Sequence, residues 1–229
     1  GLGAAGTYFL YVRSESSYYA PSGTYTMTVV ISSGLPSGVE VEPNDETAQP
    51  VDSGDVIVGS LWSADDDDYY AITTDSEGVL TVDFRTDTSQ YDGYRFYIVD
   101  EQNTVFASGV CNQSCVDSPM TLTIGLNTAG TYFLYVRSES SYYRPYGSYT
   151  LTTTFTAGTP SGLEIEPNDD DAQVVGSSDS IIGTLSSATD IDWYELEVGS
   201  AGSLTLNMST ERKNYSYYFW FYVVDQQNN

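Results

Sequence analysis

Histidine is absent from the 229 residues, and its absence excludes several familiar kinds of active site. Ser-His-Asp and Cys-His nucleophile systems need an imidazole base, and His-ligated zinc needs an imidazole ligand. A hydrolase that relies on carboxylates alone is not excluded on this ground. The sequence shows no nucleophile–base pair and no conventional metal-hydrolase motif, so we expect a protein that is not an enzyme.

Basic residues are scarce, with 7 Lys and Arg against 32 Asp and Glu, for a formal charge of −25. Such acidity argues against nucleic acid and anionic membrane surfaces as partners and leaves cations, basic proteins and neutral glycans. Adaptation of the protein to high salt would explain the acidic composition equally well. No apolar run reaches 18 residues, so we expect no membrane insertion.

Cysteine occurs only at Cys111 and Cys115, in the polar stretch CNQSC. This spacing permits a small disulfide-closed ring and suits an oxidising compartment, while a pair of free thiols remains the alternative. Two cysteines are too few for a structural zinc site. The chain begins at Gly1 without an initiator Met or a signal peptide, so we expect a processed chain or a part of a longer one.

An acidic segment, GVEVEPND at residues 38–45, returns as GLEIEPND at residues 162–169. Side chains two apart in an extended strand project from the same side, so Glu40 and Glu42 face together. The following proline keeps the preceding residue extended, and the Asn-Asp pair predicts a turn. Three carboxylates and an amide oxygen thus meet at one turn, which favours a hard cation such as calcium. A solvated acidic linker is the alternative interpretation.

The sequence is internally repeated with a period the size of a domain. GTYFLYVRSESSYY at residues 6–19 recurs unchanged at residues 130–143, an offset of 124 residues. By Tyr97 and Tyr222 the offset is 125, which indicates one inserted residue near Asn214. We interpret the chain as part of a tandem array rather than a solenoid of short repeats.

Within each period almost every segment has the alternation typical of a strand. Tyr8, Leu10 and Val12 alternate along residues 7–12. Similar runs lie at residues 24–31, 55–60, 69–74, 79–84, 94–99, 120–126, 131–136 and 148–155. No window has a helical period. We therefore predict an all-β protein of tandem antiparallel β-sandwich domains, jelly-roll-like in type.

Two linkers, SGLPSG at residues 33–38 and AGTPSG at residues 157–162, predict the domain boundaries. Residues 34–157 would form a complete sandwich. Residues 1–33 would be the closing strands of a preceding repeat, and residues 158–229 the opening strands of a following one. Such unpaired strands need partners. We expect covalent neighbours to supply them, with separate copies meeting head to tail as the alternative, and a filament in either case.

Three motifs in a fixed order resemble a known family, the bacterial pre-peptidase C-terminal (PPC) domain. They are Glu-Pro-Asn-Asp near a domain start, Asp-x-Asp-(Tyr/Trp)-Tyr about twenty residues on, and Gly-Thr-Tyr near the end. In this sequence they are EPND at 42–45 and 166–169, DDDYY at 66–70, DIDWY at 190–194, and GTYFLYV at 6–12 and 130–136. In circularly shifted form the resemblance covers the whole chain.

The resemblance implies a secreted jelly-roll sandwich, commonly appended to extracellular proteases. Collagen-binding relatives hold calcium with the acidic segment and with aspartates from the body of the sandwich. Carried over, the candidate metal ligands are Glu40, Glu42, Asn44, Asp45, Asp66 and Asp68, then Glu164, Glu166, Asn168, Asp169, Asp190 and Asp192.

Strand alternation supports the body aspartates independently, because Asp66 and Asp68 lie two apart and share a face. A solvated loop is the alternative for this acidic run. It is weakened because the second copy keeps Asp190 and Asp192 and replaces the residue between them with Ile191.

Tyrosine is abundant, at 21 residues. Tyrosines in alternating strands serve as core or as cross-strand pairs. An interface is the alternative, because Phe9, Tyr11, Phe133 and Tyr135 fall on the face opposite the Tyr/Leu/Val set.

Together these features predict a non-enzymatic extracellular or cell-surface protein: a calcium-stiffened tandem array forming a filament, stalk or adhesin, whose partners are copies of itself. The alternative is a secreted module that binds a substrate, an extracellular protein or a glycan beside a protease.

Overall fold

The computed structural model describes residues 1–12, 18, 24–32, 37–87, 93–210 and 219–225. The chain divides into two units, Gly1–Leu196 and Glu197–Asn229. Two sequence predictions fall at least partly outside the described residues, namely residues 33–36 of the linker predicted at 33–38 and the insertion near Asn214.

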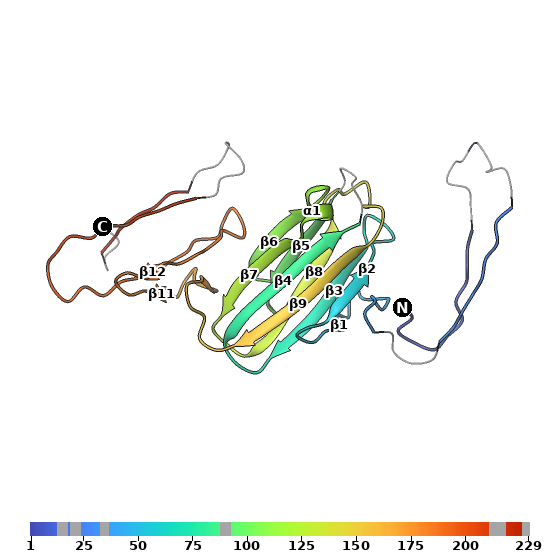
Figure 1. The fold of residues 1–229 in the computed structure, drawn as a ribbon, viewed down its shortest axis with the longest axis horizontal. Coiled ribbons are helices and arrows are strands. Elements are labelled where there is room, and N and C mark those ends of the chain that lie inside the picture. The colour runs from blue at the N-terminus through green and yellow to red at the C-terminus, as the bar shows by residue number, and fades with distance from the viewer. Residues whose placement is uncertain (13–17, 19–23, 33–36, 88–92, 211–218, 226–229) are drawn as a thin grey trace. The chain divides into compact units, whose positions relative to one another are not determined.

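The first unit contains two five-stranded sheets (Figure 1). One has the order β1-β3-β8-β5-β6 and the other the order β10-β7-β4-β9-β2. The first contains β1 (Gln49–Pro50), β3 (Asp67–Thr74), β8 (Gly130–Ser138), β5 (Tyr94–Val99) and β6 (Val105–Cys111). The second contains β10 (Ile165–Glu166), β7 (Met120–Leu126), β4 (Gly78–Thr86), β9 (Tyr149–Ala157) and β2 (Val56–Gly59).

The long strands pair antiparallel throughout, whereas the short strands β1 and β10 pair parallel with β3 and β7. A small third sheet joins β11 (Gln173–Val174) to β12 (Tyr194–Glu195), also in parallel. The all-β prediction and the antiparallel sandwich are confirmed. The division at residues 34–157, and the tandem copies themselves, stay predictions.

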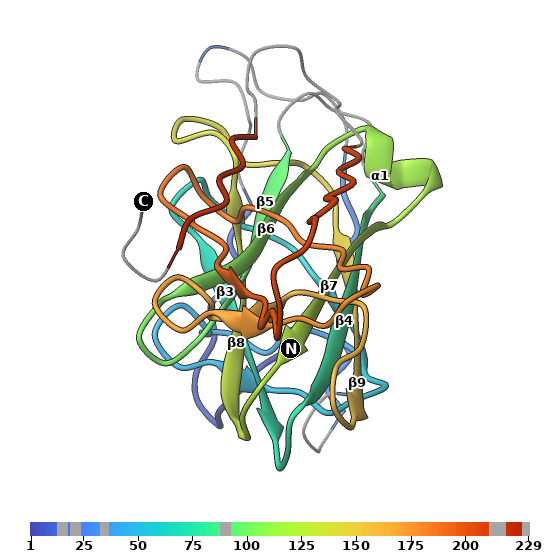
Figure 2. The same cartoon turned by 90° about the vertical axis from the view of Figure 1, so that its left-hand side faces the viewer.

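The core lies between the two sheets, which Figure 2 shows as separate layers, with β3 and β8 on one side and β4, β7 and β9 on the other. Inward side chains alternate with outward ones along each long strand, as in β4, where every second residue is buried. The largest fully buried side chains include Tyr70, Tyr94, Tyr149, Phe84 and Phe96. The last four rings stack or meet edge to face, and all three tyrosines are fully buried, so the core interpretation of these tyrosines is confirmed.

Other aromatic side chains lie on the outer face of the first sheet. Tyr135 stacks on Tyr69 with ring centroids 4.5 Å apart and on Tyr97 at 5.4 Å. All three rings are half-buried, because neighbouring strands place them side by side. These tyrosines form cross-strand pairs rather than core.

Several elements differ from the sequence prediction. Residues 7–12 and 24–31 form no strand although strands were predicted there, and β1 and β10 were not predicted as strands. Strand β6 was not expected, because Ala107, Ser108 and Gly109 at its centre are poor strand formers. Gly109 fits there since a Cβ atom would stand 2.3 Å from the sulfur of Met120. A single helical turn, α1 (Ser114–Asp117), follows β6, and a disulfide joins Cys111 at the end of β6 to Cys115 in that turn.

No helix among the described residues combines the length and the apolar character needed to cross a membrane.

Candidate metal centre

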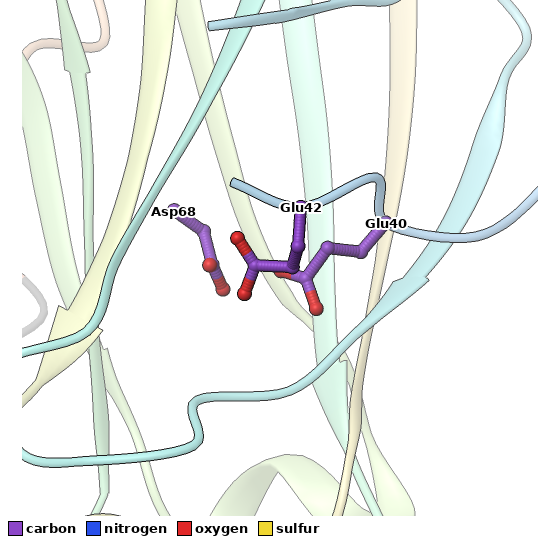
Figure 3. A group of neighbouring side chains, drawn as sticks. All are labelled: Glu40, Glu42 and Asp68. Atoms are coloured by element: carbon purple, nitrogen blue, oxygen red, sulfur yellow. The ribbon is translucent and has the colours of Figure 1, made fainter. Parts of the chain in front are cut away.

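Three carboxylates from the acidic segment and from β3 converge at one place (Figure 3). Glu40, Glu42 and Asp68 each offer an oxygen, and these oxygens all lie within 4.8 Å of one another. Glu40 and Asp68 are buried and Glu42 is half-buried. The structure thus brings together the alternate glutamates and the strand aspartate that the sequence pattern pointed to.

The backbone around this cluster is fixed from two sides. The amide of Glu40 donates to the carbonyl of Val58 in β2 at 2.9 Å. Gln49 clamps the segment, since its side chain accepts from the amide of Val41 at 2.7 Å and donates to the carbonyl of Val39 at 3.2 Å. Asp68 is held by the ladder between β3 and β8. The carboxylates are therefore positioned by strands and not by a loose loop.

The other three candidates of the first site have different surroundings. Asn44 is fully buried beside the cluster, and turning its amide by 180° would place the nitrogen 3.1 Å from Asp68 and 3.2 Å from Glu42. Asp45 accepts a hydrogen bond from the amide of Asp67 at 3.0 Å. Asp66 accepts from the amide of Trp62, and its other oxygen is buried without a hydrogen-bond partner in the described part of the chain. In the turned orientation Asn44 would hold the two carboxylates as a donor, and in the other orientation its oxygen faces them and could bind a cation. Asp45 and Asp66 order the turns around the cluster, and both stay candidate ligands.

The second acidic segment builds the same cluster from Glu164, Glu166 and Asp192, again with oxygens within 4.8 Å. Gln173 clamps the backbone as Gln49 does, accepting from Ile165 at 3.0 Å and donating to Leu163 at 3.0 Å.

The turn positions of the second site also repeat the first. Asp169 accepts from the amide of Ile191 at 2.9 Å, and Asp190 accepts from the amide of Ser186. Asn168 donates to Glu164 at 3.3 Å. The same arrangement of carboxylates, glutamine and turn aspartates therefore occurs twice in the chain.

In both clusters burial and the neighbouring carboxylates disfavour the charged form of the acidic side chains. Burial raises the pKa of Asp66 to about 6, and burial together with the charge of Glu164 raises the pKa of Glu166 to about 7. The pKa of Asp68 is raised by burial and by its contact with Glu40, and burial likewise raises the pKa of Asp192. Without a cation Asp68 and Asp192 retain protons at neutral pH and Glu166 does so in part, whereas Asp66 gains its proton just below neutral pH. A divalent cation would displace those protons.

The donor set fits a hard cation. Every candidate ligand atom is an oxygen, which is the preference of calcium and magnesium, and calcium tolerates irregular sites of six to eight oxygens. In the second site Glu166 Oε1 and Asn168 Oδ1 are buried and lack a hydrogen-bond partner among the described residues. Buried oxygens without donors are costly unless a cation satisfies them. The acidic clusters are thus able to bind a metal ion.

Two tyrosines complete the first site and were missed by the sequence analysis. Tyr149 donates to Asp68 Oδ2 at 2.5 Å, and the hydroxyls of Tyr149 and Tyr70 lie 2.6 Å apart. Tyr70 also donates to Glu40 at 3.4 Å, as Tyr194 does to Glu164 at 3.0 Å in the second site. The signal was available for Tyr70, which lies two residues after Asp68 and so shares its face. Nothing local pointed to Tyr149, which comes from β9.

No family model and no curated protein sequence matches this chain. Among solved structures, the pre-peptidase C-terminal domain of collagenase from Bacillus anthracis is similar at 20% identity, covering 49% of this chain and 98% of that domain, with a TM-score of 0.39. The periplasmic g-type lysozyme inhibitor PliG of Aeromonas hydrophila is similar at 12% identity, covering 48% and 97%, with a TM-score of 0.37.

The CBM35 of Cellvibrio japonicus Abf62 is similar at 14% identity, covering 47% of this chain and 72% of that one, with a TM-score of 0.27. Likenesses at this level neither assign the chain to a family nor transfer a function to it.

Proposed function

We propose that this protein is a non-enzymatic extracellular structural protein, in which PPC-like β-sandwich repeats follow one another and calcium stiffens each junction. The array would serve as a filament, stalk or adhesin, with copies of the repeat as its principal partners. One observation carries the proposal: the second acidic cluster stands on the short strand β10, which is hydrogen-bonded to β7 of the complete sandwich. A cation bound there would order the segment that leads from one repeat to the next.

The duplication of the site supports the same function. A single calcium site would stabilise one domain. A site repeated at each domain start would instead place one cation at every junction between domains of an array. Both copies share the carboxylate triad, the clamping glutamine, the buried asparagine and the cis peptide bond before the proline.

Calcium removal tests this function on the full chain. We expect calorimetric titration to detect calcium binding and expect EDTA to lower the melting temperature, because a ligand of the folded state alone stabilises it by about 2.7 kcal/mol at a hundredfold excess over Kd. Small-angle scattering should show a broader distribution of chain dimensions in EDTA. E42Q/D68N should remove one binding event and E166Q/D192N the other, with D52N as the control on an exposed aspartate. Unchanged melting and scattering on chelation would refute the proposal.

A secreted binding module is the second candidate, favoured by the outer-face stack of Tyr69, Tyr135 and Tyr97. Aromatic rings side by side on a sheet suit a sugar chain or a protein fibre. Affinity electrophoresis in polysaccharide gels, with Y97A against wild type, tests it. The full open reading frame separates the two candidates, since many successive copies favour the array and one or two beside a protease favour the module.

A further inference from the structure

The second acidic segment forms backbone hydrogen bonds with two different strands. On one side, Glu164 donates to the carbonyl of Ile182 at 2.9 Å and Ile182 donates to Gly162 at 3.0 Å. On the other side, Gly125 at the end of β7 donates to the carbonyl of Glu164 at 3.1 Å. Strand β10 then continues parallel to β7, with Ile165 opposite Gly125. The segment therefore connects the edge of the complete sandwich with the strand-like stretch around Ile182.

The first acidic segment has the same two sets of contacts elsewhere in the chain. Glu40 donates to Val58 at 2.9 Å, and Val58 donates to Gly38 at 3.0 Å. On its other side, Leu2 bridges Glu42 in parallel, and Gly3 donates to the carbonyl of Glu42 at 3.3 Å. Shifting Leu2 and Glu42 by the repeat offset gives Leu126 and Glu166, which are partners in the β7–β10 ladder. The register is thus identical at two separate places.

We propose that the acidic segment of each repeat is a shared strand, which adds to the β7 edge of the preceding repeat and to the β2 edge of its own. One hydrogen-bonded sheet would then run from repeat to repeat, and the occupant of each β7 edge is the next copy of the same repeat. In the complete sandwich both edges of the β7-β4-β9-β2 sheet are covered in this way, by β10 at β7 and by Val39 at β2. Covered edges do not offer a template for unspecific strand addition.

Side chains at the junction fit this role. A Cβ atom at Gly125 would stand 2.7 Å from the carbonyl oxygen of Glu164 and 3.0 Å from Pro160, so only glycine allows the two segments to approach. A second contact lies on β6, where Ser186 donates to the carbonyl of Val105 at 2.8 Å and accepts from Ser108 at 3.0 Å. Two contacts, one on β7 and one on β6 in the other sheet, would fix the rotation of one repeat about the other.

The shared strand also carries the cation ligands. Glu164 and Glu166 pair with β7 through their backbones and point their carboxylates into the second cluster. This part of the inference rests on the proposed calcium function. Strand addition and cation binding order the same residues, so each strengthens the other by the same factor.

Amide hydrogen exchange on the full chain tests the shared strand. Gly125→Val should speed exchange at residues 125, 164 and 182 at least tenfold, whereas amides of β4 and β5 keep their protection and report an intact sandwich. Gly199→Val is the matched control, because a Cβ atom there meets nothing within 4 Å. Unchanged exchange at residues 125, 164 and 182 in Gly125→Val would overturn the shared strand.

Calcium titration tests the coupling in an E42Q/D68N background, which leaves only the second site. Adding Gly125→Val should weaken calcium binding about fivefold or more, the lower end of usual coupling energies. Calcium should slow exchange at residue 125 by a matching factor. If calcium binds and Gly125→Val leaves its affinity unchanged, the coupling is wrong although the calcium function stands. If wild type binds no calcium, both the calcium function and the coupling fail, and the exchange result alone decides the shared strand.

Discussion

The same six residues, TYFLYV, have two different structures in this chain. At residues 131–136 they lie within β8, between β3 and β5, and Leu134 is fully buried. Residues 7–12 form no strand, although one was predicted, and Leu10 is 63% exposed. Among the described residues no strand pairs with residues 7–12. The alternation of apolar residues therefore predicts which side chains would share a face. The strand itself forms only where neighbouring strands supply backbone hydrogen bonds.

The metal clusters give the opposite result. The second cluster forms in the same geometry as the first although β4, β8 and β9 have no paired counterparts among the described residues that follow it. Its members lie within residues 164–192 and are held by local turns, by the β11–β12 pair and by the pairing of β10 with β7. The ligands of each site therefore come from one short stretch of sequence, while in the first site β8 also holds Asp68 and Tyr149 of β9 donates to Asp68 and Glu40.

The largest contrast is expected from matched leucine truncations. Leu134→Ala should destabilise the protein by about 2–5 kcal/mol, because it leaves a cavity in a close-packed core. Leu10→Ala should change stability by less than about 0.5 kcal/mol, since its side chain is exposed. Urea unfolding of both variants measures the difference. Equal losses would mean that residues 7–12 are packed as β8 is.

The tyrosine pair Tyr149 and Tyr25 tests the hydroxyl network at the first site. Tyr149→Phe should cost about 1–3 kcal/mol, because it removes a buried donor to Asp68 and leaves that oxygen without a partner. Tyr25→Phe is the control, since it changes the same position of the exposed copy. Thermal unfolding in EDTA measures both, and a smaller loss for Tyr149 than for Tyr25 would contradict the network.

The disulfide lies in residues 105–124, the one part of the period that the chain holds only once. We expect the native mass to be lower than the fully reduced mass by the two thiol hydrogens of Cys111 and Cys115. Replacing both by serine should cost about 1–2 kcal/mol, because the loop that the bond closes is short. Alkylation of both thiols in the unreduced native protein would exclude the bond.

The smallest effect is expected from pH. The pKa of Asp66 is raised to about 6 and that of Glu166 to about 7, so between the ordinary carboxyl pKa and these values the native state binds more protons than the unfolded state. In EDTA, stability should therefore fall as the pH rises through this window. Saturating calcium should abolish the fall, because the cation replaces the protons. Melting curves from about pH 5 to pH 8 in both buffers measure it, and identical slopes would contradict proton–metal competition.

Most of the sandwich was predictable from local patterns. The bounds of β5 and β7 match the sequence prediction, because both strands alternate cleanly between turns. Strand β6 was not predictable, because the glycine at its centre is a poor strand former. Gly109 is accommodated there because the side chain of Met120, on another strand, packs against it.

In the candidate site, two-residue spacing predicted that Glu40 and Glu42 share a face, as Asp66 and Asp68 do, whereas only the family resemblance joined the two pairs in one site. Neither predicted the hydroxyl of Tyr149, because it reaches Asp68 from across the sandwich.

The repeated register between the acidic segment and the strand before it has a consequence for the gene. In the proposed array each period would carry both halves of a junction, the β7 edge and the acidic segment that covers it. Insertion or deletion of one whole period would then leave every remaining junction with its proper partner. Unequal recombination between the identical stretches at residues 6–19 and 130–143 would lengthen or shorten the protein in unit steps, without any new interface having to evolve.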